Sequence, residues 1–429
     1  MIHPLALIAV AVLAYALLSK RLASTIITAP IFFAGVGFAV GPVLGIVDIQ
    51  EDEALLVLLL EAALVMVLFA DSSSLDIRRW TKEPSLSGRL LGVGLPLTMV
   101  AGTAAAAVVF AGVELWQAAL VGVMLAPTDA ALGQAVVANP RVPAVIRNAL
   151  NVESGLNDGL VLPFVTILIT VGLVAGGAET EQIAAEILLM ALGGSTAIGL
   201  VGGLGGGWLL RSAAERGFAS EHWQPIALVA LALGTFVIAD QVEASGFLAV
   251  WVAGLAAGMM VRGHVAGDAF HLSEQAANAL AAVGFLLLGA WLLAPVLSRA
   301  TPESVAYAAL SLTVVRIVPV AVAMLRTGFA VPTLLYVGWF GPRGLASIVF
   351  AGVVVEQAVP GAHAITDVVL LTVALSLVVH GVTAAWGARR YAAWFERAAT
   401  LDAGIPEAAE LPEGGLYHRA PSRRGVHVA

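Results

Sequence analysis

The sequence contains no cysteine and few charged residues. The absence of cysteine excludes disulfides, thiol catalysis and thiolate metal sites. Only 12% of the 429 residues are Asp, Glu, Lys or Arg, whereas 60% are hydrophobic. A soluble chain of this length needs far more charged surface to stay dispersed, so the composition indicates a membrane protein. The net charge of −8 is spread over loops and a tail, and without a basic patch it does not point to nucleic acid.

Long apolar stretches predict an all-α polytopic membrane protein. A helix needs about 20 apolar residues to cross the hydrocarbon, and the pattern predicts about thirteen such spans. The first stretch is followed, not preceded, by Lys20 and Arg21, so it is expected to be a retained helix and not a secretory signal. The predicted spans are 4–19, 24–44, 54–70, 87–112, 115–138, 144–172, 182–210, 222–240, 246–262, 271–297, 303–326, 332–358 and 364–388.

The distribution of Lys and Arg predicts the orientation. If the loop with Lys20 and Arg21 lies inside, alternation of the spans places most of the 21 Lys and Arg residues inside or in the tail. Only Arg299, Arg316 and Arg343 fall elsewhere. The predicted topology has the N-terminus outside and the C-terminus inside. Residues 1–398 then form the membrane domain, and residues 399–429, rich in Pro, Gly and charge, are expected to form a weakly ordered cytoplasmic tail.

A glycine-rich stretch, residues 193–207, lies inside an apolar span. It lacks the Lys-Ser/Thr of a phosphate-binding loop. Small residues allow the backbones of membrane helices to approach closely. The stretch therefore predicts close helix packing.

Two spans carry matching interruptions. In the fifth, Pro127 is followed by Thr128 and Asp129, and in the twelfth Arg343 lies within Gly-Pro-Arg-Gly, residues 341–344. Proline removes an amide donor and disturbs the preceding turn, and unwound backbone inside a membrane is tolerated only where it is buried or lines a wet cavity. Paired broken segments in two halves of a chain indicate a transporter site built from inverted repeats.

A polar cluster in the sixth span predicts an ion site. Ser154 and Asp158 are four residues apart, as are Glu153 and Asn157, so the four side chains fall within about 1.5 helical turns. The hydroxyl, amide and carboxylate oxygens suit Na⁺, Li⁺ or a proton. Arg316, deep in the eleventh span, needs a carboxylate partner there, and Glu153 is the best one available.

Other ionisable residues are weaker candidates. Glu61 lies in the middle of the third span, where an ion-path role and a packing role are equally compatible with its position. For Asp71, just after that span, a structural role is favoured over a role in the ion path. The histidines show no metal-ligand spacing, and His380 is expected to be structural or to lie at headgroup level. No Ser-His arrangement, paired-Asp site or zinc motif supports an intramembrane hydrolase, so neither an enzyme nor a cofactor is expected.

At these residues the sequence resembles the cation:proton antiporter superfamily, in the branch of bacterial sodium/proton antiporters and eukaryotic sodium/hydrogen exchangers. The resemblance is carried by the residues of the two broken spans, by Glu-Ser-x-x-Asn-Asp-Gly at 153–159 and by Arg316. It implies a homodimer in the cell membrane, with a core near spans 4–6 and 11–13 that moves against a dimerisation part made of the others. It also implies that the broken helices cross and that the protein serves pH homeostasis.

The resemblance further implies a division of roles. Asp158 would carry the cation and the proton, with Asn157, Ser154 and Thr128 near the ion and Glu153 paired with Arg316. Asn157 in place of a second Asp resembles the electroneutral branch. Asp129 and Arg343 would compensate helix ends at the crossing. The serines after Asp71 depart from the Glu-Gly that exchangers often show there.

The expected function is exchange of Na⁺, or another monovalent cation, for protons by alternating access, with competition at Asp158. Burial makes a carboxyl group hold its proton at higher pH, which coupling near neutral pH requires. A K⁺/H⁺ antiporter of the same fold and a passive cation channel remain alternatives, and the choice of cation stays open at this point.

Overall fold

The computed structural model describes residues 3–22, 25–46, 53–76, 86–129, 132–133, 139–177, 181–266, 269–402 and 404–409. These residues form helices joined by short connections, and no strand occurs among them. Nine of the described helices are long and apolar enough to cross a membrane, and four shorter apolar helices accompany them. The predicted all-α membrane fold is confirmed, while the number of crossings and their orientation stay predictions.

Helices overlap every predicted span. In chain order they are α1 (Pro4–Leu22), α2 (Ala29–Phe38), α3 (Glu53–Ser74), α5 (Leu86–Arg89), α6 (Leu95–Val109), α7 (Leu115–Met124), α9 (Ala144–Ala175), α10 (Glu181–Leu188), α11 (Ser195–Glu215), α12 (Trp223–Asp240), α13 (Gly246–Val261), α14 (His271–Leu287), α15 (Leu293–Ser298), α16 (Pro302–Leu312), α17 (Val314–Ala323), α18 (Val331–Trp339), α19 (Leu345–Glu356) and α20 (Ala362–Leu401).

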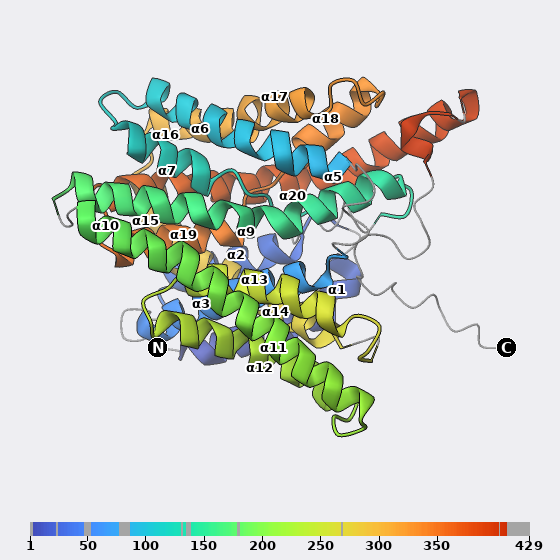
Figure 1. The fold of residues 1–429 in the computed structure, drawn as a ribbon. Coiled ribbons are helices and arrows are strands. Elements are labelled where there is room, and N and C mark those ends of the chain that lie inside the picture. Colours follow the sequence, from blue (N-terminus) through green and yellow to red (C-terminus); the bar gives the residue numbers. More distant parts are fainter. Residues whose placement is uncertain are drawn as a thin grey trace.

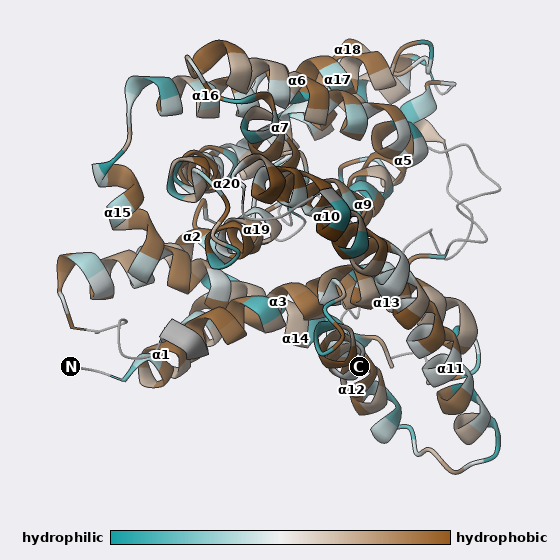
Figure 2. Ribbon diagram, turned by 60° about the vertical axis from the view of Figure 1, so that its left-hand side comes forward, coloured by the Kyte–Doolittle hydropathy of each residue, from teal (hydrophilic) through white to brown (hydrophobic). Residues whose placement is uncertain are grey.

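The helices fall into two groups. On one side α6 packs on α7, and α16, α17 and α18 lie beside them; on the other side α11 packs on α13, and α13 and α14 pack on α3. The helices α9, α19 and α20 lie between these groups (Figures 1 and 2). Hydrophobic residues also cover the outward faces of the helices (Figure 2), as expected for a protein surrounded by lipid.

The glycine-rich stretch forms the contact between α11 and α13. A Cβ atom added at Gly199 or Gly203 would overlap the carbonyl oxygen of Ala249 or Ala253, respectively, on α13. Gly207 approaches Ala257 one turn further along. The spacing of four residues places the three glycines on one face of α11. The predicted close helix packing is therefore confirmed.

Both predicted helix breaks are present. Helix α7 ends at Met124, before Pro127, and the chain is non-helical between Trp339 and Leu345. A third break was not predicted: span 303–326 is divided at Thr313, where the backbone leaves the helical region (φ −119°, ψ −92°). Neither proline nor glycine stands at this position, so the sequence offers no conformational signal for it.

Helix α20 has 40 residues and is about 60 Å long at 1.5 Å per residue. It passes through the middle of the bundle, and its C-terminal end projects beyond the other helices (Figure 1). After it, Glu407 is buried and accepts a 2.9 Å hydrogen bond from the amide of Ala330, directly before α18. The first part of the predicted tail thus includes packed residues; residues 410–429 lie outside the described part.

Candidate functional site

The two interrupted segments meet. The amide of Asp129 donates a 2.8 Å hydrogen bond to the carbonyl oxygen of Pro342, and the amide of Leu345 donates one of 2.9 Å to the Asp129 carboxylate. The Ser347 hydroxyl donates to the carbonyl oxygen of Met124, at the end of α7 (2.7 Å). Asp129 is therefore at the N-terminus of α19, where unpaired amides carry partial positive charge.

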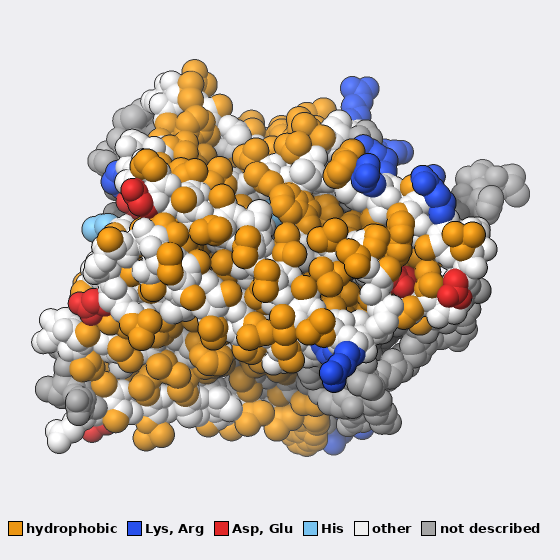
Figure 3. All heavy atoms as spheres, turned by 90° about the horizontal axis from the view of Figure 1, so that it is seen from above, with side chains coloured by type: hydrophobic (Ala, Val, Ile, Leu, Met, Phe, Trp, Pro, Cys, Tyr) orange, Lys and Arg blue, Asp and Glu red, His pale blue; other side chains and the backbone are white. Residues whose placement is uncertain are grey.

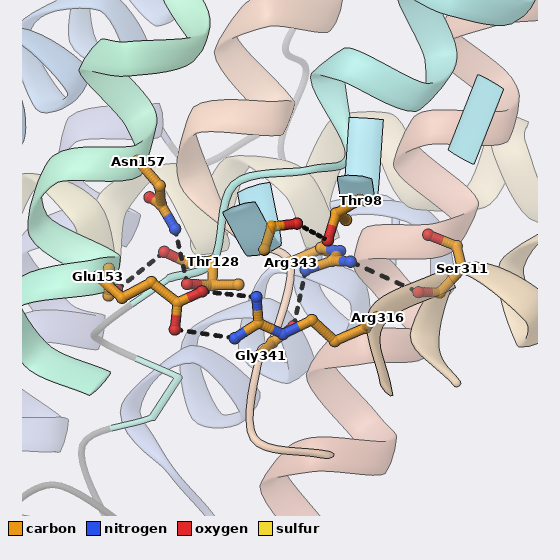
Figure 4. Close-up of polar contacts among 10 residues, drawn as sticks. Thr98, Thr128, Glu153, Asn157, Ser311, Arg316, Gly341 and Arg343 are labelled. Carbon is orange, nitrogen blue, oxygen red and sulfur yellow. Dashed lines mark hydrogen bonds and ion pairs between the residues drawn. The ribbon is translucent and has the colours of Figure 1, made fainter. Parts of the chain in front are cut away.

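Arg343 binds carbonyl groups beside the same crossing. Its guanidinium donates to the carbonyl oxygens of Gly341 (3.0 Å) and Ser311 (3.4 Å), just after α18 and near the end of α16 (Figure 4). Its amide donates to the Ser376 hydroxyl (2.7 Å). The side chain is completely buried. Carbonyl groups at a helix C-terminus carry partial negative charge, which a guanidinium compensates.

Glu153 and Arg316 form a bidentate ion pair. The two guanidinium nitrogens lie 2.6 and 2.9 Å from the two carboxylate oxygens (Figure 4), and each side chain is only 1% exposed. Parallel N–H···O bonds of this kind are among the strongest in proteins. A Cβ atom at Gly341 would overlap Arg316, so the glycine makes room for the guanidinium.

Thr128, Ser154 and Asn157 form a hydrogen-bonded group. The Ser154 hydroxyl donates to the carbonyl oxygen of Thr128 (2.8 Å), and the Asn157 amide nitrogen donates to the Thr128 hydroxyl (2.7 Å; Figure 4). All three side chains are buried. The unwound segment after α7 is thus fixed to one face of α9. The amide oxygen of Asn157 is buried and has no partner among the described residues.

Asp158 lies within α9, directly after Asn157, and is 8% exposed. Among the residues that the structure describes, its carboxylate makes no hydrogen bond or ion pair. The carboxylates of Asp129 and Asp71 lie within electrostatic range of it. A buried acid surrounded by acids and without a fixed cation favours any mobile species that neutralises it, a proton or a metal cation.

The two weaker acidic candidates, Asp71 and Glu61, lie in different parts of the structure. Asp71, at the end of α3, faces the same region as Asp158, and it has interactions of its own. The half-buried Glu61 is instead in electrostatic range of Asp240 and Glu356, which end α12 and α19. The structure therefore brings Asp71, and not Glu61, towards the cluster around Asp158.

One group beside the site, Trp251, was not singled out from the sequence, and a second, His380, was named there without a place in the fold. On α13, Trp251 packs against Gly159, next to Asp158, and its buried indole N–H has no partner among the described residues. His380 is buried inside the bundle, with ring nitrogens 3.0 Å from the Ser376 hydroxyl and from the carbonyl oxygen of Trp339. These contacts hold the imidazole inside the bundle, and its depth in the membrane stays a prediction. A tryptophan in an apolar helix carries no sequence signal of such a role.

Comparison with known proteins gives consistent matches. The family model described as sodium/hydrogen exchanger, transmembrane, matches residues 8–390. The chain is 26% identical over 345 residues to the K(+)/H(+) antiporter NhaP of Alkalimonas amylolytica, covering 80% of this chain and 58% of the relative. It is 26% identical over 312 residues to the K(+)/H(+) antiporter NhaP2 of Shewanella oneidensis, covering 71% and 52%. The chain thus spans little more than half the length of these curated relatives.

The fold also has a counterpart among solved structures. The sodium proton antiporter MjNhaP1 from Methanocaldococcus jannaschii superimposes with a TM-score of 0.70, over 91% of this chain and 97% of that one. The sequences are 18% identical. The likeness in fold therefore extends over most of the chain.

Proposed function

Because the chain belongs to the sodium/hydrogen exchanger family, we propose that it is a secondary antiporter that exchanges a monovalent cation for protons across the cell membrane. The observation that carries the proposal is the contrast between two buried acids on α9. Glu153 is neutralised permanently by Arg316, whereas Asp158 has no fixed cation among the described residues. A transported proton or cation would supply the charge that the described residues do not, and the two would compete for Asp158.

The groups around Asp158 suit a small hard cation. Carboxylate, hydroxyl and amide oxygens are the ligands that such ions prefer. The amide nitrogen of Asn157 is held by Thr128, which leaves its unpartnered oxygen available as a ligand. The hydroxyl oxygens of Thr128 and Ser154 retain lone pairs after their hydrogen bonds. These four side chains are the proposed ion site.

Na⁺ is the proposed cation, with K⁺ as the alternative. The solved structure with this fold is named a sodium proton antiporter, and the curated relatives are named K(+)/H(+) antiporters. A single competing carboxylate exchanges one positive charge for another, which supports electroneutral exchange. No resident cofactor is required, because the cation and the proton are both substrates.

Transport is proposed to occur by movement of a core against a dimerisation part. The core comprises α5–α9 and α16–α20, and the remaining helices form the dimerisation part of a homodimer. Contacts within the core cross between these two segments of the chain, as the Glu153–Arg316 pair does. Regions predicted to lie on the same side of the membrane are in contact, since Arg89 binds the carbonyl oxygens of Ala323 and Leu325. The proposed N-out, C-in orientation itself rests on the distribution of Lys and Arg.

Everted membrane vesicles with an imposed pH gradient test the proposal. An antiporter dissipates the gradient when Na⁺, Li⁺ or K⁺ is added, in proportion to the cation's affinity, and leaves it intact without cation. A passive channel carries cation current with no stoichiometric proton movement. If no monovalent cation releases the gradient at any of several pH values on either side of neutrality, the proposal is wrong.

A further inference from the structure

A groove of about 780 Å³ lies between α18 and the C-terminal part of α20. Aromatic side chains form a large part of its walls. The rings of Tyr336 and Tyr391 stack with centroids 4.1 Å apart, and Tyr391 stacks in turn on Trp394 (5.4 Å). The remaining aromatic lining consists of Trp339, Phe340 and Trp386. Leu335 and Trp386, about half exposed, form the open side, so the groove opens laterally towards lipid.

The mouth of the groove is cationic. Arg390 and Arg397 belong to its lining, and both are exposed. They are seven residues apart on α20, which is two helical turns and about 10 Å along one face. The Arg390 guanidinium lies 5.6 Å from the centre of the Trp386 ring, within cation–π distance. In Figure 3 most of the visible Lys and Arg side chains lie towards one end of a mainly hydrophobic face, with a few Asp and Glu side chains near them.

Among the residues that the structure describes, no acidic side chain lines this groove. Glu396, on the same helix, is exposed but does not belong to the lining. Glu407 lies behind Tyr391, where it is buried and accepts hydrogen bonds from Ala330 and Thr333, so its carboxylate does not line the groove. The two arginines therefore present an uncompensated positive charge to an incoming anion.

The groove is long enough to hold an acyl chain of a lipid. From Thr383 to Arg397 its wall on α20 runs about 21 Å, at 1.5 Å per residue. One leaflet of hydrocarbon is about 15 Å thick, half of the 30 Å core. The predicted last span ends at residue 388, so Arg390 and Arg397 lie at the membrane surface and Trp339 lies within the hydrocarbon. Basic pockets between membrane helices on the cytoplasmic side bind anionic headgroups.

We propose that this groove binds an anionic phospholipid, with the phosphate held between Arg390 and Arg397 and an acyl chain against the aromatic wall. The inner end of the groove is the last turn of α18, where the Trp339 indole donates to the Thr383 hydroxyl (3.0 Å). Trp339 precedes Gly341 by two residues, and the Gly341 carbonyl binds Arg343. A bound lipid therefore joins α18 to α20 next to the crossing and stabilises that part of the protein.

The test measures stabilisation of the purified full chain in detergent. Phosphatidylglycerol and phosphatidylcholine with the same acyl chains are added at equal concentrations, and the melting temperature is followed. Native mass spectrometry counts the lipids retained. We expect phosphatidylglycerol to raise the melting temperature more than phosphatidylcholine. In the double variant Arg390→Gln/Arg397→Gln this difference should fall by at least half, and the retained anionic lipid should decrease.

Arg389→Gln is the matched control, because Arg389 is exposed on the same helix but does not line the groove. It should keep the full difference between the two lipids. An equal loss in Arg389→Gln would mean general attraction to a basic surface and would overturn the proposal. Equal stabilisation by phosphatidylcholine, or by glycerol 3-phosphate without chains, would also overturn it, since the site would then not select an anionic phospholipid.

Discussion

Asp129 and Pro342 are joined by a single backbone hydrogen bond of 2.8 Å, which connects the two interrupted segments at their crossing. The Asp129 carboxylate also accepts from the amide of Leu345. Asp129 thus provides both a hydrogen-bond donor, its amide, and an acceptor, its carboxylate, to the opposite break. Disturbing either break is therefore expected to affect the other.

Asp158→Asn should abolish exchange while the protein still inserts and folds. The amide keeps the shape of the carboxyl group but binds neither a proton nor the charge of a cation. Cation-induced release of a pH gradient in everted vesicles measures the loss, with protein abundance in the membrane as the control. Substantial proton-coupled cation flux in this variant would contradict the single-carboxylate mechanism.

Glu153→Gln should lower the stability of the protein by about 3–5 kcal/mol, because it leaves Arg316 buried with no counter-charge. Ser154→Ala removes one neutral hydrogen bond, worth about 1 kcal/mol, and is the matched comparison on the same helix. Thermal melting in detergent separates the two. The double variant Glu153→Leu/Arg316→Met should be less destabilised than the sum of its single variants. Additive losses would mean that the pair is energetically unimportant.

Asp129→Asn and Arg343→Gln should reduce turnover or stability without changing the ion site. Both side chains bind backbone groups at helix ends, and neither belongs to the proposed cation ligands. The half-saturating Na⁺ concentration of the residual activity should stay within a few-fold of the wild-type value. A tenfold shift, equivalent to about 1.4 kcal/mol, in Asp129→Asn would place Asp129 in the ion site and refute this separation of roles.

Gly159→Ala should impair exchange, because the added methyl group overlaps the Trp251 ring next to Asp158. Gly205→Ala is the control: it lies within α11, and its added methyl group meets no atom within 4 Å. Alanine is favoured over glycine in a helix by about 1 kcal/mol, so the control should be neutral or slightly stabilised. Cation titration in vesicles and melting in detergent would show both effects. Wild-type affinity and rate in Gly159→Ala would argue against contact of Trp251 with the ion site.

Glu407→Ala should lower the melting temperature, because Glu407 accepts hydrogen bonds at the N-terminus of α18, whose own preceding residue, Ala330, has no capping side chain. The loss of a helix cap costs about 1 kcal/mol. Glu396→Ala, exposed on α20, should leave the melting temperature unchanged. An unchanged melting temperature in both variants would show that the contact does not contribute to stability.

The sequence predicted those parts of the site in which proline or charged residues stand inside apolar spans. Pro127 and Pro342 interrupt apolar spans, and charged residues at depth demand partners, so both breaks and the pairing of Glu153 with Arg316 could be anticipated. The resemblance carried by the same residues is confirmed by the family match.

What could not be predicted depends on three-dimensional proximity. Thr313 is an ordinary helix residue by composition, and nothing local indicates that the chain breaks there. Trp251 is one apolar residue among many until Gly159 is packed against it. Arg343 binds backbone carbonyl oxygens, which every residue has. Only the fold therefore selects those of Gly341 and Ser311.

The Glu153–Arg316 pair also constrains how the protein is made. Its members are 163 residues apart in the chain. At a synthesis rate of about 5–20 residues per second, Glu153 waits roughly 10–30 s for its partner to leave the ribosome. During that time the carboxyl group must enter the bilayer protonated or stay in contact with water. In either case the ion pair forms only after α17 has been synthesised, so this part of the N-terminal half depends on the C-terminal half for its final contacts.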